Sequence, residues 1–302
     1  MNETIAAPFR VLLATDDSEP ARQAEAWVAR LRWSRPCLVD VLCVAGHGIT
    51  RFGWGMQTYR TTVRQAVEQI RQSELLAGER VANAVGERLQ RAGLTVHAWA
   101  RQGDAAEEIL AMIDQERPDV IALGPRGRSG LAELLLGSVS HQIVVSSTLP
   151  ALIARRPPSE QGPLPEHLLV LVDGSLAAKT AIGWIARTGW AVGAKVTVLG
   201  LLGVPPGVDT DEPEAVSGLG ELVRGDAATS LDTLSEPLRE QAESLTIELD
   251  LGHPLEGAFR AAKQTGADLV VMARPPRRRG QDPFAEKLAR YASNSVLIVP
   301  AT

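Results

Sequence analysis

The clearest chemical signal in this chain is a loop spaced by glycines (the glycine loop, residues 124–138). It follows the apolar run 119–123, and its marker residues are Gly124, Gly127, Gly137 and Ser138. Glycine lets the backbone approach an anion closely and take positive φ angles. The helix-like stretch that begins at Ser138 adds unpaired N–H groups and the positive end of a dipole. Strand, glycine loop and helix start together predict a phosphate-binding site, and therefore a bound nucleotide.

Each marker residue also has a structural interpretation. A Gly-x-x-Gly pair such as Gly124 and Gly127 is common in turns after strands, and gains weight here only from Gly137 and Ser138. Ser138 could cap the following helix. It could also donate its hydroxyl to a phosphate oxygen, with the amide of Val139 as a second donor.

Charged residues lie beside the glycine loop and after the first apolar run. Arg126 and Arg128 flank Gly127, and they either face solvent or contact the phosphate through charge-assisted hydrogen bonds. Thr15 and Asp16 are assigned to the same site. Asp16 is interpreted either as a helix cap or as a contact to a ribose hydroxyl or to a metal ion on the phosphates.

Strands alternate with helices around these motifs. Apolar runs predict strands near residues 10–15, 38–44, 95–100, 119–123 and 151–154. Helical patterns lie between them, near residues 19–33, 60–92, 104–116 and 138–146. The longest helix is interpreted as an amphipathic packing helix. Such alternation predicts a doubly wound parallel sheet covered on both faces, with its ligand at the carboxyl ends of the strands.

The chain contains this unit twice. Three residues recur at one offset of 157 residues, in the pairs Asp16 and Asp173, Trp27 and Trp184, and Trp33 and Trp190. A segment rich in proline and charge separates the copies. We predict a nucleotide-binding domain at 1–156, a linker at 157–166 and a second domain at 167–302, each domain with a five-stranded parallel sheet flanked by helices.

The second repeat lacks the glycine loop. In an alignment that keeps the spacing of the loop, its four marker positions become Ala273, Pro276, Glu286 and Lys287. Proline removes an N–H donor, and a glutamate repels phosphate. Arg277–Arg279 adds positive charge, but on a rewritten loop. The sequence therefore predicts one nucleotide per chain.

Three further features carry weaker signals. The glycine-rich segment 46–55 follows the second strand and is interpreted as a flexible loop or as a lid over the ligand. His47 and His97 have no partners at metal-ligand spacing, so no metal cluster is predicted. Cys37 and Cys43 lie at the start of an apolar strand and inside it, where a small core residue is the expected role.

Bulk composition excludes several classes of protein. A chain of 302 residues with 45% hydrophobic and 22% charged residues is globular and long enough for two domains. A net charge of −5 argues against general nucleic-acid binding. Two cysteines form no disulfide framework. The first residues show no signal-peptide pattern, and no apolar stretch reaches the roughly 20 residues of a membrane helix. We expect a cytoplasmic protein without membrane or nucleic-acid partners.

The glycine loop and the segment 14–18 resemble the universal stress protein family. Nucleotide-binding members of that family carry Gly-x2-Gly-x9-Gly-Ser/Thr after the fourth strand, and the four marker residues match this motif in full. The family's first-strand Asp-Gly-Ser is matched less well, because Asp17 stands where glycine is usual. The resemblance covers nearly the whole chain, as a tandem of two family domains.

This resemblance implies a Rossmann-like fold of the adenine nucleotide alpha hydrolase type, with ATP in the glycine loop and Mg²⁺ beside it. It implies adenine near Val44, at the end of the second strand, and Asp16 near the nucleoside or the metal. Family domains commonly pair through their last strands. Residues 151–154 and 296–299 are therefore expected to form a pseudo-dimer within one chain, or two chains to form a homodimer.

These features favour an ATP-binding regulatory protein of the stress response. The first domain holds ATP, and the second is structural, dimerises or recruits an unknown protein partner. No catalytic residue is assigned, because no base candidate stands out beside the expected γ-phosphate. Two alternatives stay open: a slow ATPase or other nucleotide-dependent enzyme of this fold, and an interaction module without a ligand.

Overall fold

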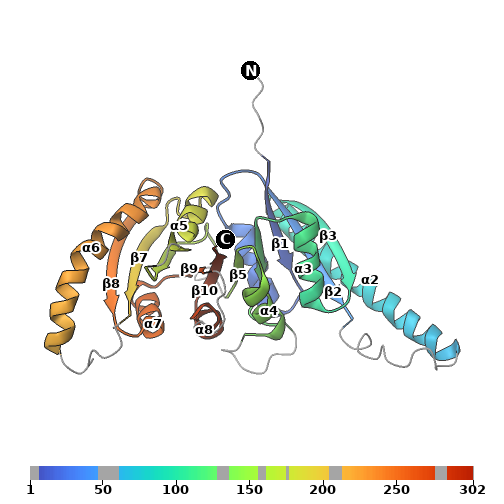
Figure 1. Cartoon of the computed structure of the whole chain (residues 1–302). Helices are drawn as coiled ribbons and strands as arrows, with labels where there is room; N and C mark the ends of the chain where they lie inside the picture. The colour runs from blue at the N-terminus through green and yellow to red at the C-terminus, as the bar shows by residue number, and fades with distance from the viewer. Residues whose placement is uncertain are drawn as a thin grey trace, which may run out of the picture. The chain divides into compact units, whose positions relative to one another are not determined.

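The chain forms two compact units. The computed structural model describes residues 7–46, 61–127, 136–155, 161–174, 177–203, 213–275 and 284–301. The first unit contains residues 1–29 and 35–155, and the second contains residues 30–34 and 156–302. In each unit, helices pack against a sheet (Figure 1).

The first unit alternates strands and helices along the chain. Its elements are β1 (Phe9–Ala14), α1 (Glu19–Arg30), β2 (Cys37–Ala45), α2 (Thr61–Arg91), β3 (Thr95–Gln102), α3 (Ala105–Glu116), β4 (Val120–Leu123), α4 (Ser138–Ser146) and β5 (Ala151–Ile153). The strands pair in parallel in the order β3-β2-β1-β4-β5. The predicted five-stranded parallel sheet is confirmed for this unit.

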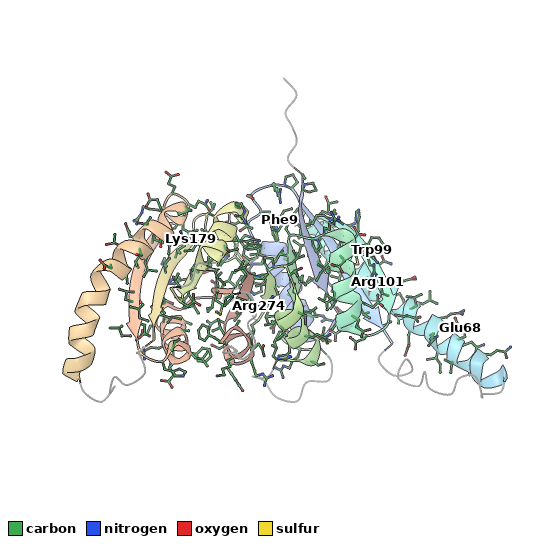
Figure 2. The ribbon with its side chains drawn as sticks, in the orientation of Figure 1. Phe9, Glu68, Trp99, Arg101, Lys179 and Arg274 are labelled. Carbon is green, nitrogen blue, oxygen red and sulfur yellow. The ribbon has the colours of Figure 1, made fainter. Side chains whose placement is uncertain are left out.

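Burial explains why the central strands are continuously apolar. Every residue of β4 is buried, as are the central residues of β1, because helices cover both faces of the sheet. The edge strand β3 is more polar and partly exposed. Trp99 and Arg101 lie on this strand (Figure 2).

The strand order places a topological switch between β1 and β4. From β1 the chain moves outward to β2 and β3, then returns to the other side of β1 as β4. Right-handed crossovers place α1 and α2 on one face and α3 and α4 on the other. Connections leaving β1 and β4 diverge to opposite faces, which opens a crevice at the carboxyl ends of these strands. Asp16 and Gly124 follow these two ends directly.

Helix α2 is longer than the sheet that it covers. Val85 and Leu89, in its C-terminal part, are buried in the core of the first unit. Its N-terminal part runs past the edge of the sheet, where Glu68 is exposed (Figures 1 and 2). The middle of α2 therefore lies at the rim of the sheet, next to the end of β2.

The second unit repeats this architecture. Its elements are β6 (His167–Val172), α5 (Ala177–Thr188), β7 (Lys195–Leu202), α6 (Pro213–Arg239), β8 (Ser244–Leu251), α7 (Pro254–Thr265), β9 (Leu269–Arg274), α8 (Phe284–Tyr291) and β10 (Ser295–Pro300). These strands also pair in parallel, in the order β10-β9-β6-β7-β8. The tandem of two doubly wound domains predicted from the sequence is confirmed.

Residues 30–34 belong to the second unit, although Arg30 is the last residue of α1 and the other four follow it directly. The helix predicted over 19–33 ends at Arg30, because Leu31 forms an isolated bridge with Leu164. Trp33 then packs edge to face against Trp190, with ring centroids 5.8 Å apart. The prediction was too long because these apolar residues continue the helical pattern of α1 but pack elsewhere.

Some equivalent residues have the same structural role in both units. Asp119 and Asp268 each accept hydrogen bonds from backbone amides at the start of the unit's first strand, β1 or β6. Gly103 and Gly252 adopt φ angles of 150° and 151° at the turns that precede α3 and α7. These residues therefore belong to the scaffold that the repeats share.

Candidate functional site

A cavity of about 530 Å³ lies at the carboxyl ends of β1, β2 and β4. This volume falls within the roughly 300–1,000 Å³ of small-molecule sites. Six of the eight residues assigned to the site from the sequence line it: Thr15, Asp16, Val44, Gly124, Gly127 and Val139. The other two, Gly137 and Ser138, stand at the start of α4, directly before Val139.

Gly124 lies where the glycine loop packs tightly on α1. A Cβ at this position would lie 2.4 Å from the carbonyl oxygen of Pro20, so only glycine fits. The carbonyl oxygen of Gly124 accepts a hydrogen bond of 2.8 Å from the hydroxyl of Ser140, a buried residue that also lines the cavity. Sequence reasoning missed Ser140; its only signal is its place in the first turn of the helix after the loop.

Gly127 brings the glycine loop against Asp16. A Cβ at Gly127 would lie 2.6 Å from Oδ2 of Asp16, so a side chain here would collide with that carboxylate. Further along, the amide of Gly137 donates to the carbonyl oxygen of Pro125 at 2.7 Å. This bond joins the two ends of the glycine loop and places the start of α4 beside it.

One arginine lines this end of the cavity, and a second, buried arginine interacts with it electrostatically. Arg126 lines the cavity, between the two glycines of the loop. Arg155 follows β5, and the pKa of its guanidinium is lowered to about 10, first by burial and then by repulsion from Arg126. An anion bound beside Arg126 would offset that repulsion. The other candidate, Arg128, lies outside the described residues.

Ser138 does not have the helix-capping role that was one interpretation of the sequence. The cap position is Gly137, with φ −68° and ψ 161° and no side-chain cap hydrogen bond. Ser138 is the first helical residue and is exposed, so it does not cap the helix. A glycine cap leaves the amides of the first helical turn without a side-chain acceptor, which suits an anion at this helix start.

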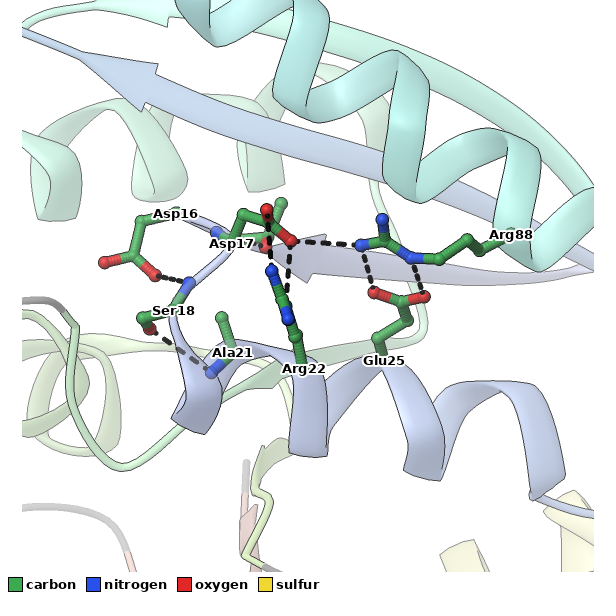
Figure 3. Close-up of polar contacts among 8 residues, drawn as sticks. Asp16, Asp17, Ser18, Ala21, Arg22, Glu25 and Arg88 are labelled. Carbon is green, nitrogen blue, oxygen red and sulfur yellow. Dashed lines mark hydrogen bonds and ion pairs between the residues drawn. The ribbon is translucent and has the colours of Figure 1, made fainter.

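Asp16 and Ser18 each accept a hydrogen bond from a backbone amide in or next to the β1–α1 connection. Oδ1 of Asp16 accepts a hydrogen bond from the amide of Ser18 at 3.0 Å. The hydroxyl of Ser18 accepts from the amide of Ala21 at 3.4 Å, at the start of α1 (Figure 3). The interpretation of Asp16 as the helix cap is therefore wrong, because Ser18 has that role. Asp16 instead closes the turn and faces the glycine loop.

Asp17 is held in an unusual conformation by a charged clamp. Its φ is +58°, a left-handed value that glycine adopts without strain. Its carboxylate pairs with Arg22 at 3.2 Å and with Arg88 at 3.1 Å, and Arg88 also pairs with Glu25 at 2.6 Å (Figure 3). Hydrogen bonding from Arg22, joined by Arg88, holds the pKa of Asp17 below its usual range. The clamp ties the β1–α1 connection to both α1 and α2.

The far end of the cavity lies between the end of β2 and the middle of α2. Cys43, Val44 and Ala45 line it from the strand. Four residues at helical spacing line it from α2: Glu74, Ala77, Gly78 and Val81. Sequence reasoning missed this second wall, because the apolar pattern of α2 was interpreted only as packing against the core.

The cysteines at the start of β2 and inside it behave as core residues. Burial raises the pKa of the Cys37 thiol, at the other end of β2, to about 12.

A magnesium ion would have one suitable carboxylate at this site. Among the described residues, no group of three His, Cys, Asp or Glu side chains could hold a metal ion alone. His97 lies instead 3.5 Å from the buried Asp40, and His47 lies outside the described residues. Mg²⁺ on a nucleotide needs only one or two carboxylates besides the phosphates. Asp16, whose Oδ2 faces Gly127, fits that requirement.

At the position equivalent to Gly124, the second unit continues its strand instead of turning into a loop. Strand β4 ends at Leu123, but β9 continues through Ala273 to Arg274. Ala273 is buried and pairs in register with Val299 of β10. Its backbone therefore belongs to the sheet, where Gly124 has already turned into a loop.

The alignment that equated Gly137 and Ser138 with Glu286 and Lys287 was wrong. Helix α8 begins at Phe284, so both of these residues lie inside its first turn. The error arose because the connection from strand to helix is shorter in the second unit, spanning 275–283 instead of 124–137. The remaining aligned positions, Pro276 and Arg277–Arg279, lie outside the described residues.

Comparison with known proteins identifies the family of both units. A sequence model of the universal stress protein family matches residues 9–155 and again residues 165–300. The chain belongs to the universal stress protein family. It carries two family domains in tandem, as the internal repeat predicted. The glycine loop lies in the first of these two universal stress protein domains.

Relatives of this universal stress protein match it over part of its length. One from Methanocaldococcus jannaschii is 30% identical over 90 residues, 29% of this chain and 53% of that protein. YxiE of Bacillus subtilis is 34% identical over 89 residues, 30% of this chain and 60% of that protein. The matches thus span between half and about three fifths of these relatives.

The fold has a close parallel among solved structures. The crystal structure of a universal stress protein from Archaeoglobus fulgidus matches with a TM-score of 0.62 at 18% identity, over 96% of this chain and 98% of that one. This likeness shows the fold alone. Among the described helices, none is both long and apolar enough to span a membrane.

Proposed function

We propose that the first unit binds one ATP per chain and that the protein acts as an ATP-dependent regulator in the stress response. The observation that carries this proposal is the close packing of the glycine loop. Gly124 abuts α1, and Gly127 abuts Asp16, in a cavity of nucleotide size. A loop so tightly placed presents backbone amides, not side chains, to an anion.

Each part of ATP has a suitable place in the cavity. The phosphates lie against the glycine loop and the start of α4, with Ser138, Val139 and the Arg126 side chain close by. Asp16 would hold Mg²⁺ at this end of the cavity, and the ion would supply positive charge that offsets that of the phosphates. The adenosine end extends toward Val44, at the end of β2.

A regulatory role fits better than a committed enzyme. Hydrolysis needs a group that positions or activates water beside the γ-phosphate. Among the described residues that line the cavity at the glycine loop, Asp16 is the carboxylate, and its Oδ1 accepts a hydrogen bond from the amide of Ser18. We therefore expect ATP to persist, with turnover that is slow at most. Steady-state turnover by the purified chain would instead favour the enzyme alternative.

The binding test compares two glycine substitutions in the same unit. Gly127→Asp places a Cβ 2.6 Å from Oδ2 of Asp16 and adds a negative charge at this end of the cavity, so it should weaken ATP binding by at least tenfold. Gly93→Asp is the matched control. Gly93 does not line the cavity and an added Cβ meets no atom within 4 Å, but its φ of +89° makes the substitution strained, so this variant shows how much affinity is lost through strain away from the site. Calorimetric titration of the full chain should give one site. Equal affinity in wild type and Gly127→Asp would refute the assignment.

A second measurement separates ATP binding from a ligand-free interaction module. Nucleotide released by heat from the freshly purified chain should be identified by mass as ATP.

The second unit is proposed to be structural, to dimerise or to recruit a protein partner. Pairing of residues 151–154 with 296–299, within one chain or between two, is part of this proposal, and the solution mass of the chain distinguishes monomer from homodimer.

A further inference from the structure

The cavity has two chemically different ends. Its charged lining residues in the described part of the chain are Asp16, Arg126 and Glu74. The first two lie at the glycine loop, whereas Glu74 lies on α2 beside the end of β2. A ligand that fits both ends is anionic at one end and offers a hydrogen-bond donor at the other, because an ionised carboxylate can only accept.

Glu74 is placed by the helix and by a glycine opposite it. Its spacing to Ala77, Gly78 and Val81 puts it on the same face of α2 as the other residues that line the cavity. Its Oε2 lies 3.2 Å from the Cβ position of Gly46, whose φ is +95°. The side chain is half-buried. Within the described residues, no hydrogen bond or ion pair engages this carboxylate.

Small residues leave a narrow space beside this carboxylate. A Cβ at Gly78 would lie 3.5 Å from the side chains of Ala45 and Ala100, so α2 approaches the strand ends closely there. Ala77 adds little bulk on the same helix face. A flat apolar ring fits between such walls, with its polar edge directed to Glu74.

We propose that Glu74 reads the base, its carboxylate accepting a hydrogen bond from the exocyclic amine of adenine. This inference rests on the proposed binding of ATP in the first unit. It makes the site selective for a purine that carries an amino group on its outer edge. The glycine loop is placed to bind phosphate, and Glu74 would add selectivity at the other end of the cavity, beside Val44.

The test removes one group from the base and one from the protein. ATP is compared with purine riboside 5′-triphosphate, which lacks the 6-amino group and is otherwise identical. A hydrogen bond to a charged acceptor is worth roughly tenfold or more in affinity. Wild type should therefore prefer ATP by about that factor. Glu74→Ala should bring the two affinities together, and Glu74→Gln, whose amide oxygen still accepts, should keep part of the preference.

A control variant and the pattern of results make the test decisive. Glu79→Ala removes an exposed carboxylate from the same helix, outside the cavity, and should leave the preference unchanged. Circular dichroism and melting should show that Glu74→Ala folds as wild type does. If ATP binds wild type but Glu74→Ala keeps the full preference, Glu74 does not read the base, and the proposed function stands. If neither triphosphate binds wild type, both proposals are wrong.

Discussion

Asp17 offers a sharp test of how the clamp supports the β1–α1 connection. A residue other than glycine at φ +58° carries a strain of about 1 kcal/mol. Asp17→Gly would relieve that strain but would raise the entropy of the unfolded chain, at a cost of about 0.5 kcal/mol. It would also remove the exposed pair with Arg22, to which we assign no energy, and the pair with Arg88, which belongs to a network with Glu25 and is worth about 1 kcal/mol. We expect Asp17→Gly to destabilise the first unit by about 0.5 kcal/mol.

A reference substitution in the second unit isolates the backbone contribution. Gly174 is the equivalent residue, at φ +74° with no atoms within 4 Å of an added Cβ. Gly174→Ala should cost about 0.5–1 kcal/mol through backbone strain alone. Asp17→Ala keeps the strain and loses the clamp, so it should cost about 1–2 kcal/mol. If the clamp contributed nothing, Asp17→Gly would stabilise the first unit, because it would relieve the kind of backbone strain that Gly174→Ala introduces in the second.

The assay is urea unfolding at pH 7, with hydrogen exchange of peptides from β1 and α1 to report the first unit separately. Because the folded pKa of Asp17 is lowered, the clamp contributes stability above the unfolded pKa and loses it as the pH falls. The destabilisation caused by Asp17→Gly should therefore shrink as the pH falls toward 3, and its sign should reverse once Asp17 is fully protonated. A more stable Asp17→Gly variant at pH 7 would refute the reasoning.

Three further predictions concern the scaffold. Arg10→Met should destabilise the first unit by about 3 kcal/mol in urea unfolding, because it removes the cation that lies 2.8 Å from the fully buried Asp40. The double variant Arg10→Met/Asp40→Leu should recover most of this loss, because it removes the buried charge as well. Burial lowers the pKa of His167, so the stability of the second unit should fall as the pH drops below about 6.5, and His167→Gln should flatten this dependence in melting curves. Trp190→Ala should cost the second unit about 3–5 kcal/mol in urea unfolding, since the ring is fully buried against Trp184; a loss below about 1 kcal/mol would contradict this.

The order and direction of the elements were predictable because the central strands are continuous apolar runs that alternate with helical patterns. Every residue of β4 is buried, and every residue in its sequence is apolar. The end of α1 was not predictable, because Leu31 and Trp33 fit the helix pattern but pack in the second unit. Local periodicity cannot show which part of the chain will cover an apolar residue.

The candidate site was predictable only where a backbone conformation constrains the residue type. Gly124 could be selected because no other residue fits against the backbone of Pro20, and Gly127 because a side chain there would have to displace the Asp16 carboxylate. Glu74 and Ser140 lie on helices, where almost any residue is allowed, so their types carry no local signal. Their roles come from the fold, which brings α2 and α4 to the same cavity as β1 and β4.

Comparing the two repeats suggests which part of Asp16 belongs to the scaffold and which to the proposed site. Both repeats carry this aspartate, as Asp16 and Asp173, although only the first carries the full glycine loop. In the first unit the two carboxylate oxygens are used differently: Oδ1 closes the turn at Ser18, and Oδ2 faces Gly127. A turn after the first strand is needed in both repeats, and explains why an aspartate stands in each. Only the oxygen that faces the glycine loop is specific to the first unit, so that oxygen is the one we assign to the ligand.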